Sequence, residues 1–207
     1  MPFYVDSPAK ELRFGDVVTG FQHPTVRIDS PDSALDLKIR VTRPQYFAVM
    51  TPCCSIELKS VSLAPLEQVR DAIVLKHPRL LENLSRLNVP FLPRDGFTAE
   101  QIAKMDLDKQ AELATLPAQY FYFDCFVYEP NGFFEAYDVK RSKQTLATIQ
   151  HRMIDFKSIF RVECSLIERE QEAPSGVKIS ELTVETRAQL RDKLTSYFGR
   201  NADEGQE

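Results

Sequence analysis

The chain has 207 residues, 43% of them hydrophobic, and carries a formal net charge of -4 at pH 7. This length suits one domain with a sizeable core. The acidic balance argues against a protein built mainly to neutralise nucleic-acid phosphates, although a local basic patch stays possible. No signal-peptide pattern opens the sequence, and no apolar stretch approaches the roughly 18 residues of a membrane span. The sequence therefore predicts a cytoplasmic protein that does not enter a membrane.

The four cysteines, Cys53, Cys54, Cys125 and Cys164, form no C-x-x-C pair. Cys125 and Cys164 fall within apolar strand patterns, where a thiol behaves as a small hydrophobe. We therefore expect reduced thiols, no metal and no cofactor. The alternative is a zinc site that combines Cys53 or Cys54 with His77 or another cysteine, and the ligand spacing does not favour it.

The first 65 residues predict several short strands. Gly15-Asp16 is a turn signal, and the β-branched run after it indicates a strand. A short extended piece is expected at residues 26–28, and the alternation over residues 35–41 is typical of a strand with one wet face. Residues 61–64 suggest another strand. Such a series fits a small barrel or a strongly bent antiparallel sheet.

The stretch from Arg43 to Glu57 is the part around which the rest of the chain appears organised. Residues 46–50 are apolar at every position, which predicts a central strand covered on both faces. A polar turn with Thr51, Cys53 and Cys54 follows directly. A thiol there becomes a nucleophile if a neighbouring base or cation lowers its pKa. The alternative is that these three side chains pack and hydrogen-bond within a tight turn.

The middle of the chain, residues 66–117, is predicted to be helical. Pro65 suits the first turn of one helix. Thr98 followed by Gln101 is a capping-box pattern, and the helix that it starts is expected to end at Pro117. The polar face of that helix is charged, which is typical of a solvated surface.

An aromatic β-hairpin is predicted next. Residues 120–128 and 133–139 are rich in β-formers, and Pro130-Asn131-Gly132 between them is a turn signal. The hairpin supplies four tyrosines, and three cations follow: Tyr120, Tyr122, Tyr128 and Tyr137, then Lys140, Arg141 and Lys143. Aromatic and cationic side chains together make a stacking surface for single-stranded nucleic acid. The alternative is that most of these aromatics belong to the core.

The last quarter predicts a helical or mixed segment over residues 146–153, a strand over residues 160–166 and a C-terminal helix. This helix begins near Thr183 and ends at Gly199, because glycine is a C-cap signal. Its apolar stripe consists of Leu190, Leu194 and Phe198, and its basic side of Arg187, Arg191, Lys193 and Arg200. Residues 201–207 are expected to be a disordered tail.

Gly15-Asp16-Val17-Val18, followed by Arg43-Pro44 and the apolar run over residues 47–51, resembles the opening of the PemK/MazF-like toxins. These are small SH3-like barrels that cleave RNA, and the resemblance covers about the first quarter of the chain. It implies the barrel. The catalytic arginine and the serine or threonine of that family have no assigned positions here, so the activity is not carried over.

A second similarity extends further along the chain. Its positions are Thr51, Cys54, Ser55 and Ile56, then Val61, Leu63, Ala64 and Pro65, and finally Phe198 and Arg200. In this order they are similar to a group of uncharacterised bacterial proteins with a T-x-S-C-D motif, in which Asp stands at the position of Ser55. The group has no function to transfer, and the similarity implies only a setting near mobile or defence genes.

Together the elements predict an α+β fold in a single domain, residues 1–200. Residues 1–65 form an SH3-like β-barrel or bent antiparallel sheet, residues 66–117 a helical insertion, and residues 118–200 the hairpin, a strand and the C-terminal helix.

Two arginines near the strands are the remaining candidates for a site. Arg40 and Arg43 suit bidentate hydrogen bonds to a phosphate or carboxylate. Equally, they are charges that protect a sheet edge from aggregation. The histidines, His23, His77 and His151, are only generic candidates for a base.

A good core without an assembled catalytic set favours a non-enzymatic binding or accessory module. We expect it to recognise a protein partner or nucleic acid, RNA or DNA, in bacterial stress, toxin–antitoxin or phage defence. The alternative is an enzyme, either a MazF-like ribonuclease or a hydrolase that uses Cys53 or Cys54. The sequence leaves the oligomeric state open.

Overall fold

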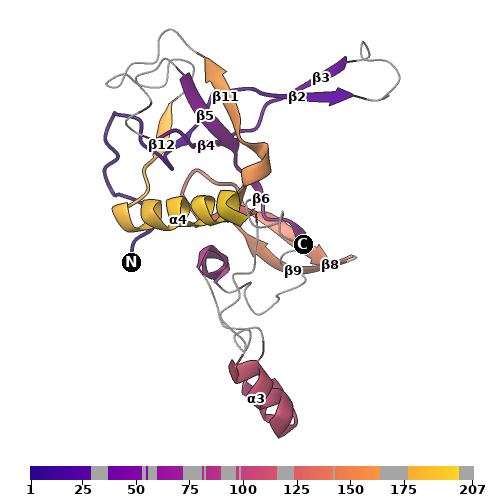
Figure 1. The fold of residues 1–207 in the computed structure, drawn as a ribbon. Coiled ribbons are helices and arrows are strands. Elements are labelled where there is room, and N and C mark those ends of the chain that lie inside the picture. Colours follow the sequence, from indigo (N-terminus) through magenta and orange to yellow (C-terminus); the bar gives the residue numbers. More distant parts are fainter. Residues whose placement is uncertain are drawn as a thin grey trace. The chain divides into compact units, whose positions relative to one another are not determined.

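The computed structural model describes residues 1–28, 37–52, 55, 60–71, 81, 83–89, 97, 99–115, 124–141, 143–163 and 177–200. Antiparallel sheets and helices make up a mixed α+β fold, which confirms the predicted class (Figure 1). The chain forms two compact units. Unit 1 joins Met1–Glu67 to Ser158–Arg187, and unit 2 joins Gln68–Lys157 to Ala188–Glu207.

Unit 1 is built on a five-stranded antiparallel sheet in the order β11-β5-β4-β1-β12. These strands are β1 (Val17–Val18), β4 (Phe47–Val49), β5 (Ser60–Pro65), β11 (Phe160–Glu163) and β12 (Lys178–Ser180). Central strand β4 is buried at all three of its positions, Phe47, Ala48 and Val49. The continuous apolar run thus marks a strand covered on both faces, as predicted.

A tight turn leads into β1. Gly15 has a φ of 86°, a left-handed value that glycine adopts without a steric penalty. The turn is closed by a hydrogen bond of 3.1 Å from the Asp16 N–H to the Arg13 carbonyl. The Gly15 N–H donates to the Val49 carbonyl at 2.7 Å, which connects the turn to β4. The predicted turn signal is confirmed.

The core of unit 1 lies on this sheet. It joins Leu12, Val18, Phe21, Phe47, Val49, Val61 and Leu63. Phe160 and Val162 of β11 pack against the cluster, whereas Arg161 and Glu163, which alternate with them, are exposed. This is the period of two that a strand has. Among the described residues β11 and β12 are the edge strands and do not pair with each other. Here the sheet does not close into a barrel.

An antiparallel hairpin, β2 (His23–Ile28) with β3 (Leu37–Thr42), also belongs to unit 1 and confirms two predicted strands. Ring contacts join its base to the core. The His23 ring centroid lies 4.7 Å from that of Phe160, and Phe160 lies 5.9 Å from Phe47. The hairpin therefore has one anchored end.

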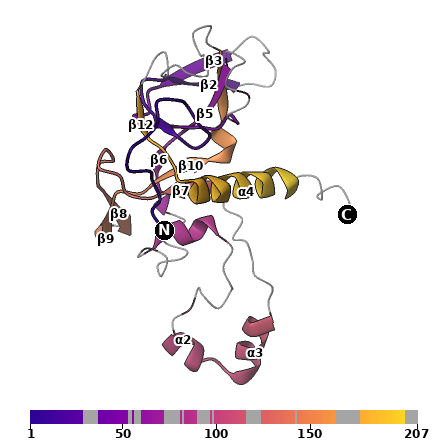
Figure 2. The same cartoon turned by 90° about the vertical axis from the view of Figure 1, so that its left-hand side faces the viewer.

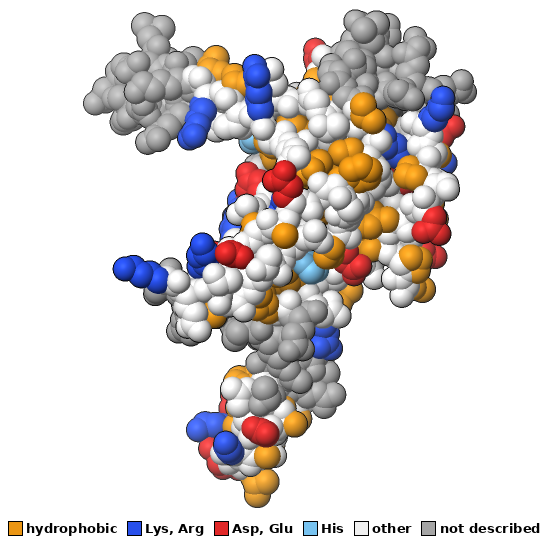
Figure 3. All heavy atoms as spheres, turned by 180° about the vertical axis from the view of Figure 1, so that it is seen from behind, with side chains coloured by type: hydrophobic (Ala, Val, Ile, Leu, Met, Phe, Trp, Pro, Cys, Tyr) orange, Lys and Arg blue, Asp and Glu red, His pale blue; other side chains and the backbone are white. Residues whose placement is uncertain are grey.

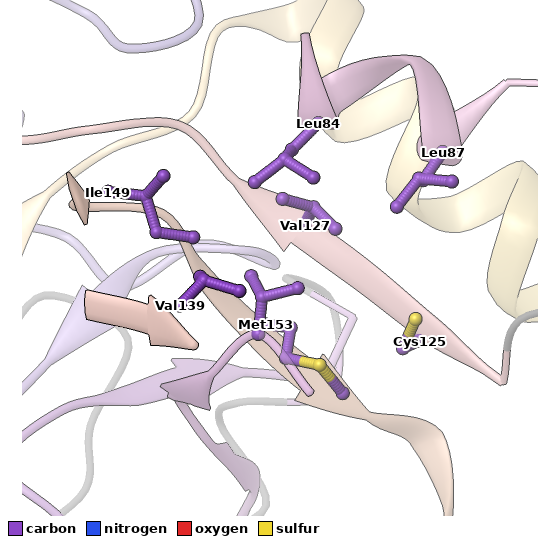
Figure 4. Close-up of a cluster of buried hydrophobic side chains, with 8 residues drawn as sticks. Leu84, Leu87, Cys125, Val127, Val139, Ile149 and Met153 are labelled. Carbon is purple, nitrogen blue, oxygen red and sulfur yellow. The ribbon is translucent and has the colours of Figure 1, made fainter. Parts of the chain in front are cut away.

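Unit 2 holds short sheets in the orders β6-β10-β7 and β8-β9. Their strands are β6 (Glu67–Gln68, at the boundary of the units), β7 (Cys125–Tyr128), β8 (Tyr137–Arg141), β9 (Gln144–Ile149) and β10 (Arg152–Asp155). The 3-10 helix η3 (Leu84–Asn88) packs onto them, and a second 3-10 turn is η5 (Phe156–Ser158). Leu84 and Leu87 of η3 join Val69, Cys125, Val127, Val139, Ile149 and Met153 in the core (Figure 4).

One buried side chain completes the free edge of β7. The Asn88 Nδ2 donates to the Val127 carbonyl at 2.7 Å, and the Val127 N–H donates to the Asn88 Oδ1 at 2.7 Å. A buried backbone needs partners for both groups, and a single amide supplies them at this edge, where no other described strand pairs with β7.

The predicted aromatic hairpin is wrong in its pairing. The turn exists, since the Phe134 N–H donates to the Asn131 carbonyl at 2.9 Å. However, β7 pairs with β10, and β8 pairs with β9. Arg141 of β8 and Gln144 of β9 are register partners, and only two residues separate them in the sequence. The shorter connection closes the hairpin, because short loops favour local pairing.

The segment predicted as helical or mixed over residues 146–153 and the start of the helix predicted at Pro65 lie in strands where the structure describes them. Residues 144–149 and 152–155 form β9 and β10. Pro65 ends β5, opposite Phe47, and does not begin a helix. Pairing with neighbouring strands overrides local propensity here. Residues 72–80, in which that helix would continue, lie outside the described residues.

The helix predicted over residues 98–117 is two helices, α2 (Ala99–Ala103) and α3 (Leu107–Thr115) (Figure 2). Asp106 begins the second, because its Oδ1 accepts the Lys109 N–H at 2.8 Å, as an N-cap does. Neither helix contains a buried residue. The solvated charged face is confirmed, and Thr98 lies outside the described residues.

Helix α4 (Val184–Arg200) begins after Thr183, as predicted. The Thr183 Oγ1 accepts the Thr186 N–H at 3.3 Å and caps the helix. Leu190 is buried, but Phe198 is 59% exposed, so the predicted apolar stripe is wrong at its end. Gly199 lies inside the helix and does not end it. The predicted tail, residues 201–207, lies outside the described residues.

Replacing Asn88 by alanine removes both partners of the buried Val127 backbone groups. We expect the free energy of unfolding to fall by about 2–3 kcal/mol, measured by urea denaturation. The control is Asn131→Ala, which removes one hydrogen bond to the exposed Phe133 N–H and should cost less than about 1 kcal/mol. Equal losses in the two variants would contradict the role of Asn88.

Candidate functional site

The described part of the catalytic candidate around Thr51 serves the sheet. Thr51 is buried, and its Oγ1 accepts the Ser62 N–H at 2.5 Å. The Met50 N–H donates to the Ser62 carbonyl at 2.7 Å. The hydroxyl thus extends the pairing between β4 and β5 beyond the end of β4. Cys53 and Cys54 lie outside the described residues.

The one cysteine that the structure describes, Cys125, is in an environment that makes its thiol unreactive. Cys125 lies on β7 and is 3% exposed. Burial raises the pKa of its thiol to about 11, so the thiol is protonated at neutral pH and is a poor nucleophile. Among the described residues no group of three His, Cys, Asp or Glu side chains is placed to hold a metal ion.

Of the described tyrosines in the aromatic stretch, one is buried and the other, Tyr137, is half-buried against the core of unit 2. Tyr128 is fully buried. The Tyr137 hydroxyl donates to the His151 carbonyl at 2.8 Å and accepts the Val69 N–H at 2.7 Å. Both side chains thus contribute to the interior of unit 2, which is the predicted alternative to a stacking surface. Tyr120 and Tyr122 lie outside the described residues.

The cations after this stretch lie at the β8–β9 connection. Lys140 and Lys143 are exposed, and Arg141 is the last residue of β8. The Lys140 Nζ lies 3.8 Å from the Asp138 Oδ2, an exposed pair that contributes little to stability. In the described part of unit 2 these cations therefore stand without the tyrosine platform that the sequence suggested.

Arg40 and Arg43 lie in unit 1, and both are exposed. Arg40 lies on β3 opposite Thr25, which is exposed too. Arg43 follows β3 directly on the way to β4. They flank a feature that the sequence did not predict, the solvent exposure of the apolar side of the hairpin.

We define the apolar hairpin face as Pro24, Ile39 and Val41. Pro24 is exposed and lies opposite Val41 in the strand register. Ile39 is 68% exposed and Val41 is 53% exposed. Because residues two apart on a strand share a face, Ile39 and Val41 lie on one side of the hairpin and Arg40 on the other. Figure 3 shows hydrophobic and basic side chains close together on the part of unit 1 that carries this hairpin.

The sequence reasoning therefore missed the meaning of the alternation over residues 35–41. It predicts a strand with one wet face and one covered face. In the structure the strand is there, but Ile39 and Val41 on its apolar side are open to solvent as well. No local signal marked this exposure, because apolar residues that alternate with charged ones are also what a strand with one covered face shows.

A buried ionic cluster in unit 1 was also missed. The Lys178 Nζ lies 2.7 Å from the Asp16 Oδ2 and 2.9 Å from the Glu181 Oε2, and the three side chains are at most 5% exposed. The Glu181 Oε1 accepts from Arg13 at 2.9 Å and from Arg187 at 3.2 Å. Gly15-Asp16 was interpreted only as a turn, although it also places a buried carboxylate.

The two carboxyl groups of this cluster titrate differently. Burial raises the pKa of Asp16 to about 6, although the hydrogen bond from Lys178 and its positive charge both lower this pKa. Burial also raises the pKa of Glu181, but hydrogen bonds from Lys178 and the Ala9 N–H outweigh it, so that pKa is lowered overall. The difference follows from the partners, because the Asp16 Oδ1 has none in the described part of the chain.

Two further cations are buried in unit 2. The Arg152 guanidinium lies 4.9 Å from the Tyr137 ring centroid and 5.8 Å from that of Phe134, and its Nη2 donates to the Glu135 carbonyl at 2.8 Å. The Lys193 Nζ donates to the Leu87 carbonyl. The prediction that Lys193 belongs to a basic surface of α4 is therefore wrong. Lys193 is buried and binds a backbone carbonyl in the interior of unit 2.

Comparisons with known proteins do not assign the site. No protein-family model, curated protein or solved structure matches the chain. The PemK/MazF-like resemblance and the T-x-S-C-D similarity therefore stay predictions. No helix in the described part of the chain is long and apolar enough to cross a membrane.

The raised pKa of Asp16 makes the stability of unit 1 depend on pH. A group whose pKa is higher in the folded than in the unfolded state stabilises the fold at low pH and loses that effect as pH rises. We expect the contribution of Asp16 to fall between pH 4 and pH 6, by about 3 kcal/mol at most. Compared with Asp16→Asn, the wild type should lose free energy of unfolding over this window.

The measurement is urea denaturation at half-unit steps from pH 4 to pH 7. Glu181 acts in the opposite direction, because its lowered pKa removes stability as the pH falls below about 4.5. The control is Asp192→Asn, whose side chain is 77% exposed and should give a constant difference. A constant difference for Asp16→Asn as well would disprove the raised pKa.

Proposed function

We propose that the protein is a non-enzymatic binding module that holds a protein partner on the β2–β3 hairpin of unit 1. One observation carries the proposal. Ile39 and Val41 are 68% and 53% exposed on a hairpin that has no third strand among the described residues. Exposed apolar clusters rimmed by polar residues are typical of interaction sites.

The energetics favour a partner. A two-stranded hairpin alone is only marginally stable, and a third strand or a packed face normally supports it. Fully burying an exposed isoleucine or valine contributes roughly 1.5–3 kcal/mol per side chain. Because the aromatic contact of His23 with Phe160 anchors one end, a partner meets a hairpin that is already positioned.

Nucleic acid is the second candidate partner. The observation that favours it is the pair of exposed lysines, Lys140 and Lys143, at the β8–β9 connection. Since Tyr128 is buried and the half-buried Tyr137 is hydrogen-bonded to Val69 and His151, contacts there would go to phosphates only, and binding would weaken steeply with salt. This candidate rests on fewer contacts than the hairpin does.

The enzymatic alternatives, a MazF-like ribonuclease or a Cys-dependent hydrolase, gain no support from Thr51. Its Oγ1 already accepts a backbone hydrogen bond. The SH3-like barrel also stays a proposal. What supports it is a five-stranded antiparallel sheet with the Gly15-Asp16 turn before its strand β1 and Arg43-Pro44 before its central strand.

The test is capture of a partner from the lysate of the protein's own host, with nuclease added. We expect a protein to be retained in stoichiometric amount by the wild type and lost with Ile39→Glu/Val41→Glu. The matched control is Val177→Glu, because Val177 is a 62% exposed apolar residue of the same unit. Equal retention by the hairpin variant and the wild type would rule out the hairpin as the binding surface.

A further inference from the structure

We propose that the partner binds as an extended, acidic segment that adds to the free edge of β3 as a third strand. This inference rests on the proposed function, because it concerns the same hairpin. It specifies the chemistry of the partner and the edge that the partner uses.

The backbone points to β3 and not to β2. Each strand of a two-stranded hairpin has one outer edge whose N–H and C=O groups are open to a further strand. Pro24 lies within β2 and has no N–H to donate, which weakens that edge. Strand β3 contains no proline over its six residues, Leu37–Thr42. Strand addition uses such an uninterrupted edge for main-chain hydrogen bonds.

The charges indicate the sign of the partner. The sequence of β2 and β3, together with Arg43, contains four basic residues, Arg27, Lys38, Arg40 and Arg43, and no aspartate or glutamate. The whole chain nevertheless has a net charge of -4. The connection between the strands, residues 29–36, contains three aspartates, Asp29, Asp32 and Asp36. The two strands, and not the connection, are thus the basic part of the hairpin. Opposite charges across neighbouring strands stabilise a sheet, whereas like charges destabilise it.

The pattern along β3 indicates how the partner alternates. Apolar residues occupy positions 37, 39 and 41, and basic residues occupy positions 38 and 40. Since side chains alternate between the two faces of a strand, an added strand meets an apolar side and a basic side. A segment that alternates apolar and acidic residues matches both. The exposed Ile39 and Val41 would then be covered on the apolar side.

The same charges argue against two other occupants. A second copy of this chain would place two basic hairpin edges against each other, which is unfavourable. Nucleic acid would neutralise the cations, but its phosphates would make no favourable contact with the exposed apolar side chains of Ile39 and Val41. The alternative to any occupant is that these basic residues protect the edge of β3 from strand addition, in which case no peptide segment binds there.

The experiment selects ten-residue peptides from a displayed random library on the full-length protein, with counter-selection on Ile39→Glu/Val41→Glu. We expect enriched peptides that alternate acidic and apolar residues and lack proline. A fluorescent copy of the most enriched peptide is then titrated at low salt. Arg40→Glu should weaken its binding by about tenfold or more. Arg161→Glu, which changes an exposed strand arginine of the same unit, should leave the binding unchanged.

Backbone addition is tested with the same peptide carrying N-methyl groups at alternate residues. Methylation on the hydrogen-bonding side should abolish binding, whereas methylation on the other side should not, because only one edge of an added strand pairs with β3. Equal effects of the two methylated peptides would overturn strand addition.

The outcomes separate this proposal from the proposed function. Selection of basic peptides, of patternless peptides or of none would overturn the acidic-strand proposal. If such a selection failed but Ile39→Glu/Val41→Glu still lost the lysate partner, the proposed binding function would stand and only the acidic-strand proposal would fall. Retention of that partner by the hairpin variant would overturn the function as well. A labelled 20-nucleotide single strand that bound the wild type and lost its binding with Arg40→Glu would replace the acidic segment by nucleic acid.

Discussion

Unit 1 depends on the buried ionic cluster around Lys178 and Glu181. The Glu181 carboxylate accepts from Arg13, which is 168 residues away in the sequence, and from the Ala9 N–H. Lys178 also donates to the Glu11 carbonyl at 2.8 Å. A buried ion pair does not by itself ensure stability, because removing charges from water is costly. Its effect here is to specify which distant segments meet, since each charge without its partner would be strongly unfavourable.

That specification explains how one sheet forms from two ends of the chain. Strand β12 begins at Lys178 and pairs with β1, which Asp16 directly precedes. Strand β11, from the same late segment, pairs with β5 on the other side of the sheet. The central strand β4 as a result has two strands on either side of it in the sheet. The late segment therefore supplies both edge strands of the sheet, and residues 1–65 do not make this five-stranded sheet by themselves.

The hairpin obtains its position from the same sheet. Phe160 of β11 contacts the ring of His23 at the base of the hairpin and the ring of Phe47 in the core. Farther along the hairpin, Ile39 and Val41 are open to solvent. The contact at the base and the exposed apolar side chains beyond it make a surface that is open to a partner. The function proposed for the protein follows from this difference between neighbouring parts of one unit.

Local patterns sufficed for several elements. The apolar run over residues 46–50 identified the buried central strand, because a strand covered on both faces has no position that favours a polar residue. Gly15-Asp16 identified a turn that requires a left-handed glycine. The alternation over residues 35–41 and 160–163 identified β3 and β11. The start of the last helix was predicted near Thr183, and α4 begins directly after it. In each case the signal lies within a few neighbouring residues.

By itself, the sequence determined the α+β class, the central strand and the residue types that accompany the hairpin. The tertiary structure decided the rest, because pairing partners and burial depend on residues far apart in the chain. Strand β7 pairs with β10 and not with β8, Lys193 donates into the interior, and Ile39 stays exposed although its pattern equals that of a covered strand. An alternating pattern indicates that a strand has one apolar and one polar face. What covers either face is settled only by packing with distant segments.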